Sequence, residues 1–379
     1  HDPCPAWSLQ ETHGEEGMIQ KADGIFYAPQ STGKVVKTVG EGEFFFSVIG
    51  LDHGHIYAMV NGLTEAGATL KDVYDPDPAK VNAFIDRFPC AHPVSCADEI
   101  LLDSSIQLVA SAIRPDKRAS LGVAIMKSGH HYFTDKPGML TFDDLKIVQQ
   151  VQKETNRWFM VYFGERIHVE GAVCVQRLID EGALGRVLSV TILAPHRLNK
   201  ETRPGWFFNP DENGSILCDI GSHQFEQLLS YTGARSGRIE YSEERNFNNP
   251  DHPHFTDFGQ AVIGLDNGAT GYIRVDWFTP SGLSAWGDGR VFIVGTKATV
   301  EIRKYINVGV SMEGDNVFLV DADGEHVINA TGKEGFPFFG AFLRDCLDGT
   351  QTCMTQEHVF ESMRLTLEAH HKACCNDLH

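Results

Sequence analysis

The sequence lacks the features of a membrane or nucleic-acid protein. Nothing in its 379 residues approaches the roughly eighteen uninterrupted apolar positions of a membrane-spanning helix. It also lacks a basic segment followed by an apolar one near its first residue, which a signal peptide would show. Positive charge is scarce, since 32 lysines and arginines against 51 acidic residues give a net charge of −19. Acidic surfaces repel phosphates, so we expect neither a nucleic-acid nor a membrane partner.

A disulfide framework is missing as well. The nine cysteines are odd in number and scattered, which favours a reducing, cytoplasmic setting. Only the tail segment 370–375, His-His-Lys-Ala-Cys-Cys, has the look of metal ligands, because on a helix each histidine would face a cysteine four residues on. The segment lacks a second ligand pair at finger-type spacing, so we expect no metal site.

The glycine signature of a dinucleotide-binding turn is incomplete. Laid on G-x-G-x-x-G, only Gly50 fits, because Asp52 and His55 occupy the second and third glycine positions. The surrounding pattern is nevertheless regular. An apolar run over 44–49 is followed by helical periodicity and by a second short strand over 68–75, which predicts a β-α-β unit.

Such a unit directs the amides and dipole of its first helix at an anionic group above the turn. We therefore expect the turn from Gly50 to His55, including Asp52, His53 and Gly54, to hold a dinucleotide pyrophosphate. Asp75 lies 21 residues after Gly54, the distance at which a carboxylate accepts from the adenosine ribose hydroxyls. A β-α-β turn that binds nothing stays open from this stretch alone.

The length predicts two domains, because 379 residues exceed what one compact core comfortably serves. Residues 42–163 alternate strand and helix, which predicts an α/β, doubly wound parallel domain. Residues 164–379 contain helices around a long meander of hairpins, which predicts an α+β domain on a large, mostly antiparallel open sheet. Residues 1–41 are polar and turn-rich and form an N-terminal extension or arm.

Two local features can carry chemistry. Lys136 follows a parallel strand, where ligands bind in open α/β sheets, and its bond to Pro137 can be cis and turn the lysine inward. A surface lysine in a turn is the alternative. Asp219 and His223 share one face of a helix expected over 214–231. A carboxylate fixes the imidazole tautomer, as proton transfer requires, and a surface ion pair is the alternative.

These pieces combine into a resemblance to a known family. Asp135-Lys136-Pro137 resembles the Glu-Lys-Pro motif of the glucose-fructose oxidoreductase and inositol dehydrogenase (Gfo/Idh/MocA) family. The segment from Gly214 to His223 is similar to that family's Gly-(x)4-Asp-x-Gly-x-His helix. The segments 75–77 and 182–187 also read like members, and the resemblance covers about residues 43–379.

The family consists largely of NAD(P)-dependent enzymes that act on sugars, inositols and related polyols. Its members join a Rossmann domain to an α/β domain whose open sheet often builds the oligomer. The resemblance implies that Lys136, Asp219 and His223 are catalytic and that Asp135, Lys136 and Pro137 lie at the cofactor. Departures are Asp135 for the usual glutamate, Glu226 where an aspartate is common, and Asp52, which puts a charge near the pyrophosphate.

We therefore expect an NAD-dependent dehydrogenase that oxidises a secondary hydroxyl of a sugar, polyol, inositol or glycoside. His223, oriented by Asp219, accepts the hydroxyl proton, and Lys136 stabilises the alkoxide and holds the substrate. Further candidates for substrate contacts, with structural roles equally open, are Arg166, Arg203 and Trp206.

Two other functions stay open. A glycoside-cleaving enzyme could retain NAD and oxidise its substrate transiently, and a non-catalytic sensor could bind a nucleotide or a sugar. We expect NAD over NADP, because Asp75 repels a 2′-phosphate and the following segment 76–78 supplies no cation. We also expect a homo-dimer or homo-tetramer built on the uncovered face of the sheet, with the extension able to reach the neighbour.

Overall fold

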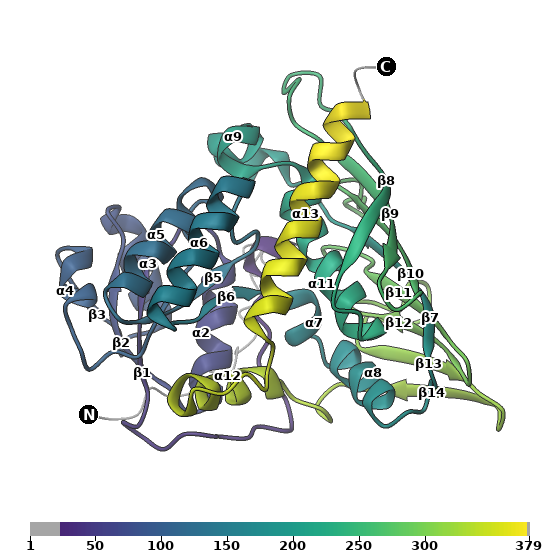
Figure 1. Ribbon diagram of the computed structural model, residues 1–379, viewed down its shortest axis with the longest axis horizontal. Helices are drawn as coiled ribbons and strands as arrows, with labels where there is room; N and C mark the ends of the chain where they lie inside the picture. The colour runs from purple at the N-terminus through teal and green to yellow at the C-terminus, as the bar shows by residue number, and fades with distance from the viewer. Residues whose placement is uncertain (1–22, 377–379) are drawn as a thin grey trace. The chain divides into compact units, whose positions relative to one another are not determined.

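The computed structural model describes residues 23–376, and their side chains as far as Cys374. The chain divides into two compact units (Figure 1). The first contains residues 25–162 and 336–359, and the second contains residues 163–335 and the chain from 360 onward. Among residues 23–376, no helix combines the length and the apolar character needed to cross a bilayer.

The first unit is a six-stranded parallel sheet with strand order β3-β2-β1-β4-β5-β6. All six strands run parallel, and the direction in which successive strands are added reverses where the chain crosses from β3 to β4. Right-handed crossovers therefore place helices on both faces of the sheet. The near-continuous apolar runs become strands whose residues are almost all buried, as a sheet covered on both faces requires. The strands are β1 (Phe45–Ile49), β2 (Thr69–Tyr74), β3 (His92–Pro93), β4 (Leu108–Ser111), β5 (His131–Asp135) and β6 (Phe159–Tyr162). The helices are α2 (His55–Glu65), α3 (Pro78–Arg87), α4 (Ala97–Leu101), α5 (Pro115–Lys127), α6 (Phe142–Thr155) and α12 (Pro337–Asp348).

The sequence predicts that residues 164–379 form one domain, but helix α12 belongs to the first unit. Residues 336–359 belong to the first unit, because α12 packs on α2 at a position without a side chain. A Cβ at Gly62 would overlap the ring of Phe339, so the glycine lets the two helices approach closely. The chain therefore returns to its first unit before its last helix.

The second unit is built on an eight-stranded sheet with order β14-β13-β12-β11-β7-β10-β9-β8. All its neighbouring strands run antiparallel except β7 and β10, which confirms the mostly antiparallel sheet. The strands are β7 (Val187–Pro195), β8 (Gly237–Arg245), β9 (Phe258–Leu265), β10 (Thr270–Asp276), β11 (Arg290–Gly295), β12 (Thr299–Arg303), β13 (Asn316–Val320) and β14 (Glu325–Asn329). The helices are α7 (Gly164–Ile167), α8 (Glu170–Asp180), α9 (Pro210–Asn213), α10 (Ile216–Asp219), α11 (Gly221–Thr232) and α13 (Gln356–Asn376), with short 3-10 turns at Lys200–Thr202 and Gly205–Phe208.

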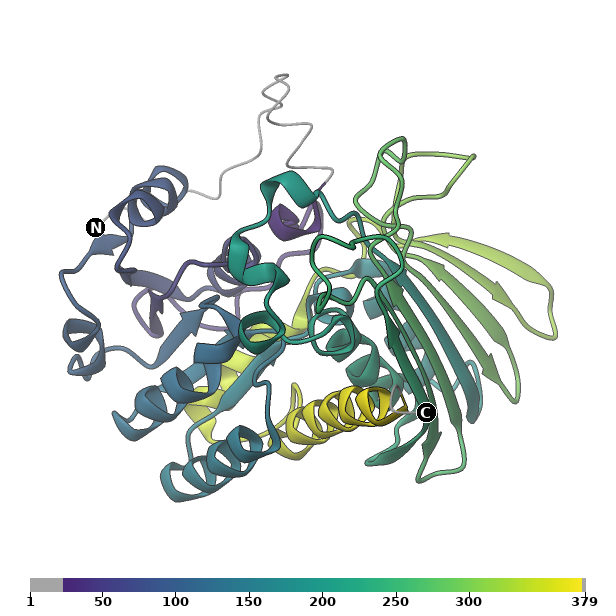
Figure 2. The same cartoon turned by 90° about the horizontal axis from the view of Figure 1, so that it is seen from above.

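The helices of this unit cover one face of the sheet (Figure 2). Side chains alternate along its strands between a buried core and the other face. On that other face Val262, Val294 and Val327 are 39 %, 44 % and 72 % exposed. The sheet therefore has one packed face and one face that presents apolar side chains.

Candidate active site

The turn after β1 is built around Gly50. Its φ of +88° is a conformation that L residues rarely adopt, and a Cβ there would lie 2.7 Å from the Cβ of Ile113. The backbone of Gly50 donates to the Tyr74 carbonyl and accepts from the Ala112 amide, at 2.9 and 3.1 Å. The turn is thus held between the ends of β2 and β4 and has the close backbone approach of a dinucleotide-binding turn.

Helix α2 begins immediately after this turn, with Gly54 as its N-cap residue. The ring Nδ1 of His53 accepts a hydrogen bond from the backbone N–H of His55 at 3.2 Å. The His53 carbonyl accepts from the Ile56 amide at 3.3 Å. The sequence therefore replaces two motif glycines with side chains and still begins a helix whose dipole favours an anion at the turn.

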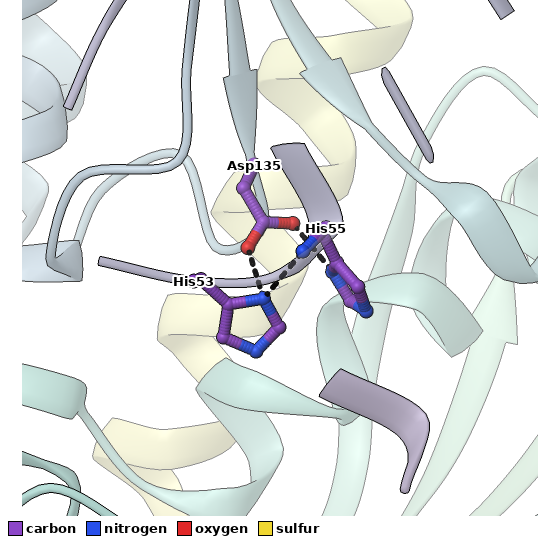
Figure 3. Close-up of side chains that lie close together, drawn as sticks. All are labelled: His53, His55 and Asp135. Atoms are coloured by element: carbon purple, nitrogen blue, oxygen red, sulfur yellow. Dashed lines mark hydrogen bonds and ion pairs between the residues drawn. The ribbon is translucent and has the colours of Figure 1, made fainter. Parts of the chain in front are cut away.

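Both histidines of the turn face the carboxylate of Asp135 at the end of β5 (Figure 3). The Nδ1 of His55 lies 2.8 Å from Asp135 Oδ1, and the Nδ1 of His53 lies 3.3 Å from Oδ2. Burial alone would raise the pKa of Asp135, but His55, Arg118 and His53 together hold it well below its usual value. Burial and the adjacent His55 lower the pKa of His53 well below its usual value. Asp135 is therefore a buried anion against the turn.

Arg118, which sequence reasoning missed, fixes the loop that carries Lys136. Its guanidinium is buried and lies 3.2 Å from Asp135 Oδ2. It also donates to the carbonyls of Ile113, Lys136 and Pro137. The Lys136–Pro137 bond is cis, as the sequence suggested, and Lys136 is 5 % exposed. The alternative of a surface lysine is therefore wrong. The one sequence signal for this role is that Arg118 lies early in a helix that follows a parallel strand.

Asp75 follows β2 and lies against the glycine turn. Its Oδ2 accepts from the Leu51 amide at 2.8 Å, and its Oδ1 accepts from the Asp77 amide at 2.9 Å. Each carboxylate oxygen can accept more than one hydrogen bond. The turn and the ribose-binding candidate are thus one connected feature.

Asp52, at the second glycine position, is turned to partners of its own. Its Oδ1 lies 2.5 Å from Lys80 Nζ, and its Oδ2 accepts from the Arg114 amide at 2.8 Å. The negative charge of Asp52 at the predicted pyrophosphate site is therefore paired with the Lys80 ammonium. Asp75 is also among the acids that raise the pKa of Lys80, after Asp52. Our expectation considered only residues 76–78, and Lys80 is a cation just beyond them.

The N-terminal extension packs on α2 of its own chain in the part that the structure describes. The Ile25 carbonyl lies where a Cβ at Gly54 would point. Farther along, the amide and hydroxyl of Ser31 donate to the carboxylate of Glu65 at 3.0 and 2.8 Å. Residues 1–22 of the expected arm lie outside the described residues.

Asp219 and His223 lie on two consecutive helices rather than the single helix expected over 214–231. Helix α10 ends at Asp219, and α11 begins at Gly221. Ile220 between them has helical dihedrals, φ −78° and ψ −45°, so the helical path continues. Asp219 and His223 are 7 % and 2 % exposed. The alternative of a surface ion pair is therefore wrong, since both side chains are buried.

A buried charge network, also missed from the sequence, accompanies His223. Lys304 Nζ lies 3.1 Å from Glu165 Oε2 and donates to Gln227 at 2.7 Å. Gln224 donates to the other Glu165 oxygen at 3.1 Å. Burial would raise the pKa of Glu165, but Lys304 and then His223 and His196 lower it to about 2. An ionised carboxylate is therefore close enough to His223 to stabilise positive charge on it.

Arg166, a substrate-binding candidate, forms a bidentate ion pair with Glu226. Its Nε lies 2.8 and 2.9 Å from the two carboxylate oxygens, and its Nη2 lies 2.5 Å from Oε1. Glu226 is fully buried, so the glutamate at the family's aspartate position has a matched cation. This geometry gives Arg166 a structural role, and a substrate contact stays a prediction.

Arg203 and Trp206 belong to an aromatic cluster of the second unit. The guanidinium of Arg203 lies over the rings of Phe207 and Trp277, 4.8 and 5.2 Å from their centroids. Trp206 packs beside Phe207. The Arg203 side chain is only 3 % exposed, so stacking stabilises it in place. Contact of either residue with a sugar stays a prediction.

The predicted residues thus form two groups, one in each unit. The group of the first unit comprises Gly50, Asp52, His53, Gly54, His55, Asp75, Asp135, Lys136 and Pro137. The group of the second unit comprises Asp219, His223, Arg166, Arg203 and Trp206, and Glu165 and Lys304 accompany His223. The first group combines a glycine turn, a helix N-terminus and a carboxylate, which suit a dinucleotide. A proton-transfer role for the second group stays a prediction.

Two family models match the chain. A model described as "Oxidoreductase family, NAD-binding Rossmann fold" matches residues 45–163. A model described as "GFO/IDH/MocA C-terminal domain" matches residues 173–301. Together they cover more than half of the chain and fall in the two units described above.

Several known proteins are similar to the chain. D-xylose dehydrogenase of Paenarthrobacter nicotinovorans is 23 % identical over 150 residues, and this match spans 38 % of each chain. Scyllo-inositol 2-dehydrogenase (NAD(+)) of Bacillus subtilis is 24 % identical over 259 residues, 68 % of this chain and 72 % of that protein.

Solved structures match over a larger share of the chain. A putative oxidoreductase from Erwinia carotovora atroseptica is 42 % identical, with a TM-score of 0.84 over 87 % of this chain and 98 % of that one. Levoglucosan dehydrogenase in complex with NADH and levoglucosan has a TM-score of 0.73 at 17 % identity, covering 88 % and 97 %. At that identity the second likeness shows the fold alone.

Proposed function

We propose a reaction from the premise that this chain belongs to the GFO/IDH/MocA family of oxidoreductases, whose two domain models it matches. The chain is an NAD-binding oxidoreductase by that membership, and the proposal concerns what it oxidises. It takes a hydride from a secondary alcohol carbon of a sugar, polyol, inositol or glycoside. The observation that carries the proposal is the buried His223 with an ionised Glu165 nearby, in a chain that also holds a buried Lys136 beside its dinucleotide turn.

The names of the relatives support this class of substrate. They include a D-xylose, a scyllo-inositol and a levoglucosan dehydrogenase. The first two are less than 25 % identical to this chain and the third is 27 % identical. The class is therefore supported, and the individual compound stays open.

The first unit contains the residues that would hold the cofactor. The glycine turn at Gly50 and the N-terminus of α2 would hold the pyrophosphate, and Asp75 would accept from the adenosine ribose. When bound, NAD supplies the hydride acceptor. The carboxylate of Asp75 favours a ribose hydroxyl over a 2′-phosphate, and Lys80, the nearby cation, is already paired with Asp52. We therefore retain the preference for NAD over NADP.

The second unit supplies the proton acceptor. His223 takes the hydroxyl proton as the hydride leaves carbon, and Asp219, four residues earlier, would fix its tautomer. The imidazolium that forms is stabilised by Glu165, whose pKa of about 2 keeps its carboxylate ionised at neutral pH. Lys136 stabilises the developing alkoxide with its positive charge. Glu165 thus stabilises the positive charge that forms on His223, and Lys136 stabilises the negative charge that forms on the substrate oxygen.

A panel of sugars, polyols, inositols and glycosides, assayed for NADH formation with product analysis, tests the proposal. Steady NADH formation with one ketone produced per NADH supports it. Release of a free sugar without net NADH would instead indicate an NAD-retaining glycoside-cleaving enzyme. Binding of NAD and sugar with no turnover on the whole panel would indicate a sensor. Asp52 does not favour a sensor, because Lys80 pairs with the carboxylate that stands at the second glycine position.

Assembly and location complete the proposal. The uncovered sheet face exposes Val262, Val294 and Val327, so a second copy of the chain would cover it in a homo-dimer or homo-tetramer. A single-chain mass by light scattering at micromolar concentration would contradict this. The odd number and scattered spacing of the nine cysteines support a reducing, cytoplasmic setting.

A further inference from the structure

The C-terminal helix α13 and the edge strand β8 bring together three side chains that can bind a metal. Glu244, His370 and Cys374 place a carboxylate oxygen, an imidazole nitrogen and a sulfur within 4.8 Å of one another. The Nδ1 of His370 lies 2.8 Å from Glu244 Oε2, and the sulfur of Cys374 lies 3.8 Å from that nitrogen. The sequence pointed to His370 and Cys374, and the fold adds Glu244 from 126 residues earlier.

The helix that carries two of these side chains is fastened to the strand that carries the third. The hydroxyl of Ser242 donates to the Ala369 carbonyl at 2.7 Å, and Lys372 donates to the Ile239 carbonyl at 2.6 Å. Figure 1 shows α13 lying along β8. Because these bonds fix both elements, the ligands are held in place without an ion.

A backbone hydrogen bond to the carboxylate oxygen that does not face His370 fixes the orientation of Glu244. Its Oε1 accepts from the backbone N–H of Leu217 at 3.1 Å, and the residue is 5 % exposed. His370 is about one-third exposed at its side chain, and Cys374 is exposed. A cation could therefore enter from solvent, meet a fixed carboxylate and keep water at a fourth position.

The separations fit a tetrahedral ion of borderline softness. Metal–ligand bonds of about 2.3 Å to sulfur and about 2.0–2.2 Å to nitrogen and oxygen place such ligands roughly 3.4–3.6 Å apart. The observed 3.8 Å between sulfur and nitrogen is close to this value. The 2.8 Å between nitrogen and oxygen is a hydrogen-bond distance and would lengthen by about half an ångström as the ion replaces the proton.

The other three-ligand group of the described residues is less suited to a cation. It consists of His53, His55 and Asp135, and its carboxylate already carries the guanidinium of Arg118 at 3.2 Å. That arginine supplies the positive charge that an ion would bring. The ligand set on α13 and β8 also contains a thiol, which favours Zn²⁺ over Mg²⁺ or Ca²⁺.

We propose that Glu244, His370 and Cys374 form a binding site for a divalent cation of the Zn²⁺ type. This replaces our expectation from the sequence of no metal. That expectation rested on the lack of a second ligand pair, and the strand supplies a third ligand instead. The second pair in the tail, His371 with Cys375, lies partly outside the described side chains. The site makes no use of the dehydrogenase residues, so it stands apart from the proposed reaction.

Titration of the chelator-treated full-length protein with Co²⁺, followed by absorbance, tests the site. We expect one ion per chain and a near-ultraviolet band from thiolate coordination. Cys374→Ser should abolish that band. Loss of a supporting group around a metal commonly lowers affinity 10- to 100-fold, so Glu244→Gln and His370→Asn, which remove direct ligands, should weaken binding at least about tenfold. Zn²⁺ should displace Co²⁺ with loss of the band.

Cys96→Ser is the matched control. Cys96 is also exposed, with its sulfur 4.0 Å from a carboxylate oxygen of Glu99, and it belongs to no three-ligand group of the described residues. This variant should keep the band. No thiolate band in the wild type, or a band that survives in Cys374→Ser, would overturn the proposal. If a variant fails to fold, X-ray absorption of the Zn²⁺-loaded wild type decides, because one sulfur in the coordination shell supports the site and none refutes it.

Discussion

Glu165→Gln should destabilise the protein because it leaves the Lys304 ammonium buried without its carboxylate. The Lys304 side chain is fully buried and would keep the neutral Gln227 oxygen at 2.7 Å but lose its ion pair. Lowering a pKa from 4.5 to about 2 corresponds to about 3 kcal/mol in favour of the charged carboxylate. Burial lowers the pKa of Lys304, which offsets part of this. Removing one partner of a buried pair costs about 3–5 kcal/mol, so we expect a loss of about 3 kcal/mol.

Urea unfolding of three variants measures this. Glu165→Gln and Lys304→Met should each unfold at lower urea than the wild type, and the double variant should recover much of the loss because it buries no charge. Asp251→Asn is the control, since its ion pair with Lys200 is on the surface and should leave the midpoint nearly unchanged. A Glu165→Gln variant as stable as the wild type would refute the reasoning.

The stability difference between the wild type and Glu165→Gln should depend on pH. The pKa of Glu165 is lower in the folded state than in the unfolded state, so its stabilisation is fully present above about pH 4.5 and is lost as the pH falls toward 2. The stability difference between wild type and Glu165→Gln should therefore narrow between pH 5 and pH 3. A difference that stays constant or widens over this interval would contradict the assignment.

Two further predictions concern the turn. Asp75→Asn should weaken NAD binding and reduce the discrimination against NADPH, since it removes the charge that repels a 2′-phosphate; equal binding of NADPH and NADH by the wild type in calorimetry would show the role to be wrong. Gly50→Ala should lower the thermal midpoint more than Gly129→Ala. Both have positive φ, +88° and +96°, but only Gly50 has a neighbour within 3 Å of the added Cβ. A left-handed alanine costs about 1–2 kcal/mol by itself, so equal losses would mean that the contact with Ile113 relaxes freely.

The sequence predicts best where the evidence is local. The apolar run before Gly50 predicts β1 because a strand buried on both faces shows near-continuous apolar residues. The segment 135–137 predicts the cis bond because it combines a strand end with a proline. The turn from 266 to 269 joins antiparallel β9 and β10 as its Asp-Asn-Gly sequence indicates.

What the sequence does not predict depends on distant pairs. Glu165 and Lys304 are 139 residues apart, and Glu244 and His370 are 126 apart. A lysine at the end of a strand normally lies in solvent, and no periodicity marks the one that the fold buries. The return of 336–359 to the first unit is hidden for the same reason, because the contact of Phe339 with Gly62 joins segments far apart in the chain.

The proton-transfer role of His223 is the central claim, and its most direct test is turnover of His223→Ala on the substrate found in the panel. We predict a fall in kcat of roughly 10²- to 10⁴-fold, the range that general-base catalysis contributes. The Kd for NAD in calorimetry should stay nearly unchanged, because the histidine acts on the substrate hydroxyl. Wild-type turnover in this variant would contradict the account, and Lys136 would become the first alternative for the base.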